Sequence, residues 1–390
     1  MKIRLSRAEL ALFLVPAVVF PLAVAGNRWK IANMPLPTPI PTATPTLIPN
    51  FFRGAGQSNQ IPIASRDGRR IITHPDSGRN GVRFAVWNAK TGDLVRRFGS
   101  FRGGVGNKAP ILSPNGQMVL FDNGGYHYDR LVLLEVGTGR QLRQWKRKGT
   151  EGYGVALSND YLATLSNDDV RLHSVKSGAL VKKLRDRARD YYPTDPNFSP
   201  EGERICWIGF STWEYEEYGN GFKDNEIVSF DVARGQRIWR RAFPHVHLTQ
   251  IRHTGDGKTL VARGDQYFWT KSRKGKALSA YRKIWGIDAL TGTKLWEKHA
   301  EYGGNEIPVS PDGKWIALTL RHDDSSGNAR IAICEARTGK QRGEFLDSFT
   351  EVFWSADSSQ IWTSANERVV LQKGGSWSAP QPIKPQFPPS

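Results

Sequence analysis

The stretch Val86-Trp87-Asn88-Ala89-Lys90-Thr91-Gly92-Asp93-Leu94 decides the fold of this 390-residue chain, because its pattern recurs along the sequence. In each copy an apolar segment leads into a Thr-Gly-like pair, and a second segment with strand character follows. Glycine accepts positive φ angles, so such a pair is typical of a tight reversal between two strands. Further copies lie at Thr138-Gly139, Ser177-Gly178, Arg234-Gly235, Thr291-Gly292, Thr338-Gly339 and, in degenerate form, Lys373-Gly374.

A second tight turn, of the Ser-Pro-Asp-Gly type, precedes each of these phrases. Its copies begin at Ser65, Ser113, Ser199, Thr254, Ser310 and Ser355, with a shortened copy at Ser158. Two hairpins in each unit build one four-stranded antiparallel sheet, and seven units of roughly 48 residues match the period of propeller blades. The sequence therefore predicts an all-β fold, a seven-bladed β-propeller of four-stranded antiparallel blades over residues 59–379. Thirteen Trp and 18 Phe residues are expected mostly to fill the spaces between blades.

An uncharged apolar core at 10–26 precedes the repeats, with basic residues on both sides of it. This is the pattern of an export signal, and we assign residues 1–30 to a signal-anchor helix or a signal peptide. The triplet Ala23-Val24-Ala25 favours cleavage, whereas an apolar helix of about 25 Å is usable as an anchor.

A Pro-rich segment at 31–58 follows, with a proline at nearly every second position of 35–49. Such a run favours extended polyproline II. A stiff stalk suits a domain whose one end is fixed, so we favour the retained anchor. The expected location is the cell membrane, single-pass with the propeller outside the cytoplasm; the alternative is a secreted or periplasmic protein after cleavage. Residues 380–390 are predicted to be a Pro-rich disordered tail.

The formal net charge of +18 favours contact with an acidic partner. We expect a protein, or an acidic envelope polymer or lipid surface, and membrane contact through the N-terminal segment. Nucleic acid is not the expected partner, because the export signal places the domain outside the cytoplasm.

Insertions occur only in the connections between second and third strands and between blades. Strand direction alternates, so these connections emerge on one face of the propeller, and binding residues often lie on such variable loops. Two insertions, Ser211 to Glu226 in blade 4 and Gly264 to Lys283 in blade 5, combine aromatic and charged residues. We predict a binding site at Trp213, Tyr215, Glu216, Glu217, Tyr218, Tyr267, Trp269, Lys271, Arg273, Lys274 and Lys276. The alternative is that the acidic and basic insertions pair with each other.

No pattern predicts a catalytic residue, a cofactor site or a metal site. The stretch 255–259 resembles the end of a P-loop but aligns with the hairpin turn at Ser310. His245, His247 and His253 are spread too far along an extended chain for one zinc, and we expect loop or surface histidines. Cys206 and Cys334 fall on blades two apart, which is too far for a disulfide, so both are expected as buried thiols.

Two phrases resemble known repeats. Ser310 to Ala317 is similar to the turn-and-strand phrase of bacterial WD40-like repeats, and Ile287 to Trp296 is similar to the repeat of pyrroloquinoline-quinone (PQQ) propellers. The chain thus resembles the WD40-like and quinoprotein-like propeller superfamily, of bacterial exported type, over roughly residues 60–378. These folds host many functions.

From these observations we expect a noncatalytic binding or scaffold module that acts through its long-loop face. The alternative is an enzyme, either a quinone (PQQ)-dependent oxidoreductase, which the resemblance implies, or a hydrolase that uses the central channel.

Overall fold

A computed structural model describes residues 63–382 with gaps at 66, 79–80, 90, 92, 102–109, 123–129, 147–153, 167–168, 187–190, 212–213, 217–218, 222–224, 273–274, 301–306, 324–327, 348–351, 356, 364–366, 372–376 and 379–380. The predicted signal-anchor and stalk lie outside the described residues. The chain divides into two compact units, 1–42 and 43–390, and the strands all belong to the second. Among the described residues, no helix is long and apolar enough to cross a membrane.

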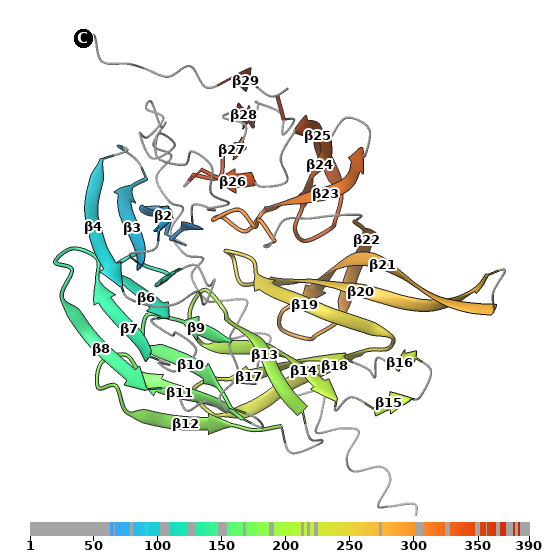
Figure 1. Ribbon diagram of the computed structural model, residues 1–390, viewed down its shortest axis with the longest axis horizontal. Helices are drawn as coiled ribbons and strands as arrows, with labels where there is room; N and C mark the ends of the chain where they lie inside the picture. Colours follow the sequence, from blue (N-terminus) through green and yellow to red (C-terminus); the bar gives the residue numbers. More distant parts are fainter. Residues whose placement is uncertain are drawn as a thin grey trace, which may run out of the picture. The chain divides into compact units, whose positions relative to one another are not determined.

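The strands form antiparallel sheets in chain order (Figure 1). The first sheet contains β1 (Ile63–Ala64), β2 (Arg70–Gly78), β3 (Gly81–Asn88) and β4 (Leu94–Phe101). The second contains β5 (Ile111–Leu112), β6 (Met118–Asp122), β7 (Arg130–Glu135) and β8 (Gln141–Lys146). The third contains β9 (Val155–Leu157), β10 (Tyr161–Leu165), β11 (Val170–Ser174) and β12 (Leu180–Leu184). The fourth contains β13 (Tyr191–Phe198), β14 (Arg204–Ser211), β17 (Asn225–Asp231) and β18 (Gln236–Phe243).

The remaining sheets continue the same order. The fifth contains β19 (Val246–His253), β20 (Thr259–Ser272), β21 (Gly275–Asp288) and β22 (Lys294–His299). The sixth contains β23 (Trp315–Asp323), β24 (Asn328–Glu335) and β25 (Gln341–Asp347). The seventh contains β26 (Val352–Trp354), β27 (Gln360–Thr363), β28 (Glu367–Val370) and β29 (Gln381–Pro382). A separate two-stranded sheet, β15 (Glu214–Glu216) with β16 (Gly219–Gly221), lies between β14 and β17 in the chain.

The described residues form six four-stranded blades, not the seven that the repeats predict. The sheet that falls short is the sixth, where an inner strand was expected at Glu306 to Val309. Among the described residues of this stretch, 307–309, the pairing is an isolated bridge between Val309 and Ile316. Pro308 has no N–H to donate to a ladder, which accounts for the short pairing at this edge. The all-β propeller architecture is otherwise as predicted.

The Ser-Pro-Asp-Gly turns owe their shape to side-chain hydrogen bonds with the local backbone. In the turn before β23, the Ser310 hydroxyl donates to the Asp312 carboxylate at 2.7 Å and accepts from the Trp315 N–H at 2.9 Å. Gly313 at the end of this turn has φ +74°. The same hydroxyl-to-carboxylate contact recurs at Ser65, Thr254 and Ser355, and the Ser113 hydroxyl donates to the amide oxygen of Asn115. The predicted structural role of these turns is confirmed.

Neighbouring sheets pack through buried apolar clusters. One cluster joins the fourth and fifth sheets and includes Ile208, Trp239 and Trp285. Similar clusters join each earlier and later pair of consecutive sheets, from the first two to the last two. Buried tryptophans therefore fill spaces between blades, as expected.

A second set of contacts is polar and runs from the outer strand of one sheet to the third-to-fourth-strand turn of the next. The Trp239 indole N–H donates to the Ala289 carbonyl at 3.0 Å, and the Trp296 indole N–H donates to the Ala336 carbonyl at 3.0 Å. Trp145 makes the equivalent bond to Gly178 at 2.9 Å. In the first sheet Arg96 takes this part, donating to the Gly137 carbonyl. In these four pairs of consecutive sheets, the Thr-Gly-like turn of one sheet thus also contacts the outer strand of the sheet before it.

Replacing Gly292 with alanine should destabilise the propeller by about 1–3 kcal/mol, because the residue has φ +72° and an added Cβ would lie 2.7 Å from the Trp239 ring. Chemical denaturation of the two proteins measures the difference. Gly137→Ala is the matched control, since no described atom lies within 4 Å of its added Cβ. Equal stability of Gly292→Ala and the parent would contradict this account of the turn.

Candidate functional site

The blade 5 insertion is a two-stranded β-ribbon and not a loop. β19 pairs with β20 only as far as Gln266, and β22 pairs with β21 only as far as Lys283. Beyond these positions, β20 and β21 pair only with each other, ending in the pair Ser272–Gly275. We call the segments 267–272 and 275–282 the ribbon. Figure 1 shows it extending past the neighbouring strands, toward the same side of the view as β15 and β16.

The predicted binding residues are distributed over these two insertions. Tyr267, Trp269 and Lys271 occupy alternate positions of β20, and Lys276 lies on β21 as the register partner of Lys271. Tyr215 and Glu216 lie on β15, opposite Asn220 and Gly219 of β16. The other predicted residues lie outside the described residues, namely Trp213, Glu217, Tyr218, Arg273 and Lys274. Both insertions connect second to third strands in consecutive sheets, which is the connection type expected on one face.

One side of the ribbon carries an aromatic cluster that the prediction missed. The rings of Phe268 and Tyr281 stack with centroids 4.5 Å apart, and Tyr281 meets His299 edge-on at 5.7 Å. Tyr281 nevertheless remains 55% exposed. Successive positions of a strand face opposite sides, so Phe268 occupies the opposite face of the ribbon from positions 267 and 269. This period of two is the sequence signal that could have identified the aromatic cluster.

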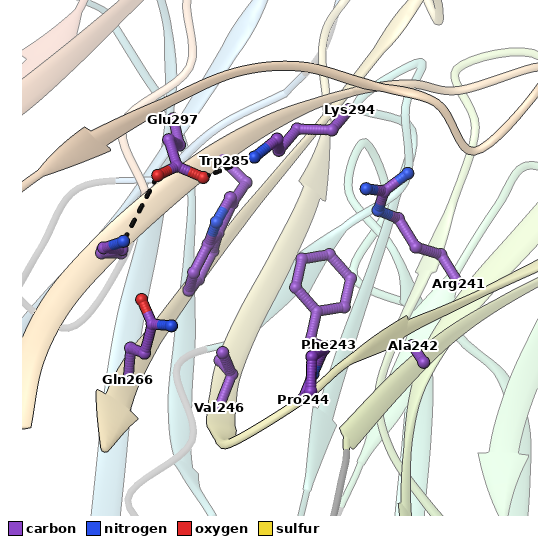
Figure 2. Close-up of a pocket in the computed structure, with 10 residues that line it drawn as sticks. Arg241, Ala242, Phe243, Pro244, Val246, Gln266, Trp285, Lys294 and Glu297 are labelled. Carbon is purple, nitrogen blue, oxygen red and sulfur yellow. Dashed lines mark hydrogen bonds and ion pairs between the residues drawn. The ribbon is translucent and has the colours of Figure 1, made fainter. Parts of the chain in front are cut away.

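A pocket of about 200 Å³ lies at the foot of the ribbon, between the fourth and fifth sheets (Figure 2). Its apolar lining includes the rings of Phe243 and Trp285, which meet edge-on at 5.4 Å and are both buried. Gln266 and Lys283 connect it to the ribbon, because they are the last residues of β20 and β21 paired with the outer strands. Arg241, Ala242, Pro244, Val246, Lys294 and Glu297 complete the lining.

The pocket has more positive than negative charge. Glu297 is its one acidic residue, and its carboxylate pairs with Lys294 at 2.6 Å and Lys283 at 3.3 Å. The hydrogen bond from Lys294 lowers the pKa of Glu297, and Lys283 adds to this effect against a small opposing effect of burial. With Arg241, three cations stand against one anion. Only Gln266 and Lys283 fall within the predicted insertion, and no sequence pattern indicates that β18 packs beside β20, β21 and β22 here.

Arg241 ties the pocket to the neighbouring turn. Its Nη1 donates to the Gly292 carbonyl at 2.9 Å, and its guanidinium carbon lies 5.7 Å from the centre of the Phe243 ring. Its Nε is buried and has no hydrogen-bond acceptor among the described residues. A buried donor of this kind costs free energy until an acceptor reaches it.

A buried cluster of Cys206, His253 and Asn197 has the residue types of a thiol nucleophile with its base. Cys206 Sγ lies 3.7 Å from His253 Nε2, and His253 Nδ1 lies 3.1 Å from Asn197 Oδ1. Cys206 has no exposed surface, and burial raises the pKa of its thiol to about 12. A thiol that is neutral and inaccessible is not a nucleophile, so the cluster is part of the packing between the fourth and fifth sheets. The expectation that His253 is a loop or surface residue is wrong, since it is 3% exposed.

The described residues contain no group of three His, Cys, Asp or Glu side chains that could hold a metal ion. Cys206 and Cys334 are both buried free thiols, as predicted. Cys206 lies on the second strand of the fourth sheet, and Cys334 lies on β24 of the sixth.

Residues 223–379 match a protein-family model described as outer membrane protein assembly factor BamB. The matched range contains the ribbon, the pocket and the PQQ-like phrase at 287–296. The fold is similar to that of hydrazine synthase from Kuenenia stuttgartiensis, with a TM-score of 0.55 and 14% identity, over 83% of this chain and 98% of that one. It is also similar to the β-propeller domain of Cps50 (Swd1) from Myceliophteria thermophila, with a TM-score of 0.53 and 14% identity, over 80% and 93% of the two chains. At this identity the two structures show a shared fold alone. No curated protein sequence matches the chain.

Both thiols should be unreactive toward a thiol reagent at pH 8 in the native protein. Burial raises the pKa of Cys206 to about 12 and that of Cys334 to about 11, so neither forms thiolate at that pH. Addition of guanidinium should release two reactive thiols, measured by absorbance. Rapid modification without denaturant would show that the Cys206 cluster is open to solvent and return it to consideration as a reactive site.

Proposed function

Because the chain has the fold and repeats of the PQQ-like and WD40-like propeller superfamily, we propose that it is a noncatalytic module that docks an acidic partner protein on its ribbon. The matched family description names an assembly factor, a kind of protein that acts by binding others. We further propose that the module is extracytoplasmic and is held to a membrane by its N-terminal segment.

The charge of the ribbon is the observation that carries this proposal. The stretch 266–287 contains six basic residues and no acidic one. Lys271 and Lys276 are directly opposite in the ladder, and Arg273 and Lys274 come between them in the sequence. Like charges at directly opposite positions destabilise a strand pair, so this register favours an acidic partner beside the ribbon.

The geometry of the ribbon adds a second argument. A two-stranded hairpin is marginally stable in water by itself, and the ribbon leaves the sheet after Gln266. Its two outer edges have no paired strand among the described residues. Exposed Tyr281 and stacked Phe268 supply the kind of aromatic surface that anchors protein interfaces. A partner that covers the ribbon would stabilise it.

The buried cluster of Cys206, His253 and Asn197 offers no comparable argument for catalysis. The one nucleophile-like cluster is inaccessible, with Cys206 fully buried. The quinone-dependent alternative has no observation in its favour among the described residues.

Replacing Lys271, Arg273, Lys274 and Lys276 together with serine should weaken binding to immobilised polyglutamate about tenfold at low ionic strength, and less at high salt, because added salt screens surface charge. The same variant should capture less crosslinked protein from native envelopes. The matched control replaces Arg69, Lys176, Lys314 and Lys340, four basic residues of the tight turns, and removes the same charge. An equal loss in the control would show that net charge, and not the ribbon, drives binding.

Deleting residues 1–30 should move the protein from the membrane fraction to the soluble fraction, because the apolar core at 10–26 is the proposed anchor. Fractionation with a carbonate wash measures this. Recovery of the full-length gene product as a soluble protein that begins after Ala25 would identify a cleaved signal peptide and reject the anchor.

A further inference from the structure

We infer that the pocket at the foot of the ribbon receives a carboxylate side chain of the docked protein, together with apolar atoms of that side chain or its neighbour. This inference rests on the proposed docking function, because it names the group that a partner lying along the ribbon would insert.

The size of the pocket favours a side chain over a free ligand. Sites for drug-sized molecules usually measure about 300–1,000 Å³, whereas this one measures about 200 Å³. The pocket is also open toward the ribbon through Gln266 and Lys283, which are continuous with its two strands. A chain that follows the ribbon can therefore reach it without leaving the surface.

The pocket lining favours a ligand group that combines a negative charge with apolar atoms. Figure 2 shows the rings of Phe243 and Trp285 at the centre, with Glu297, Lys294 and Arg241 around them. The rings are buried and provide an apolar wall for methylene or aromatic groups. The cations provide the complement to a charge, since Glu297 leaves two of three positive charges uncompensated.

Arg241 determines where the charge would lie. Its Nη1 donates to the Gly292 carbonyl, while its buried Nε has no hydrogen-bond acceptor among the described residues. A carboxylate can accept from this donor and from Lys294, which is 44% exposed and keeps freedom to turn away from Glu297. Hydrogen bonds between ionised groups are the stronger kind, and a charged ligand is therefore preferred over its neutral amide.

The test uses the full-length chain in detergent and two capped dipeptides that differ only in charge, acetyl-Phe-Glu-amide and acetyl-Phe-Gln-amide. Titrations followed by ligand-observed NMR should show the glutamate peptide binding about tenfold more tightly than the glutamine peptide. Benzoate serves as the free small carboxylate and should bind more weakly than the glutamate peptide. Equal binding of the two peptides would overturn the role of charge, and tighter binding of benzoate would overturn the assignment to a side chain.

Variants of the pocket should shift this preference in opposite directions. Lys294→Gln and Arg241→Gln should each weaken the glutamate peptide about tenfold, whereas Glu297→Gln should strengthen its binding because a competing carboxylate is removed. Lys298→Gln, on the same strand but outside the lining, is the charge-matched control and should have no effect. Because Arg241→Gln also removes the bond to Gly292, the more exposed Lys294 keeps the test valid if that variant fails to fold. Weakening by Glu297→Gln, or no effect of Lys294→Gln, would overturn the inference.

The two proposals can fail separately. The ribbon variant with four serines leaves the pocket lining intact, so it should bind the glutamate peptide like the parent. Loss of polyglutamate binding alongside intact peptide binding supports both proposals. Intact polyglutamate binding in the serine variant would reject the ribbon as the docking element. If the parent protein does not prefer the glutamate peptide over the glutamine peptide, only the proposed role of the pocket is rejected.

Discussion

The propeller depends on one repeated contact between consecutive sheets, a donor on an outer strand that reaches a backbone carbonyl in the next tight turn. At Trp239 and Trp296 the donor is an indole whose ring also rests against the glycine of that turn, so one side chain both packs and hydrogen-bonds. The turn must pass close to the ring, which only a residue without a side chain at positive φ allows. The Thr-Gly turn therefore has two structural roles: it reverses the chain, and it contacts the outer strand of the preceding sheet.

This double role explains why the fold was predictable from the sequence. Turn residues mark the strand reversals without any knowledge of long-range contacts, and their spacing counts the sheets. The predicted number of four-stranded sheets was wrong where a local turn pattern is present but strand pairing is incomplete. The turn at Ser310 forms as predicted. Because Pro308 lacks an N–H, the segment ahead of this turn does not form a strand ladder among the described residues, and the sixth sheet has three strands. In the same way, the insertion around Tyr267 contains no Gly, Pro, Asn or Asp between Asp265 and Gly275, and this absence indicates two long strands and not a loop.

The candidate site was less accessible to sequence reasoning, for a physical reason. The ribbon residues are contiguous in the chain, so composition alone drew attention to Lys271 and Trp269. The pocket combines Phe243 from the end of one sheet with Trp285 and Lys294 from two strands of the next, and only the packing of the sheets brings them together. Burial likewise could not be read locally for His253, whose neighbours Asn197 and Cys206 come from another sheet.

The last sheet has a mechanical consequence. Its outer strand β29 comes from Gln381–Pro382, the beginning of the segment assigned to the tail, and β1 to β4 of the first sheet all come from the beginning of the repeats. No strand ladder among the described residues crosses from the beginning of the repeats to their end. A pulling force applied between Ile63 and Pro382 would meet two residue pairs between β28 and β29, and two between β1 and β2, before the end sheets began to peel. The sheets that carry the ribbon and the pocket would bear load later.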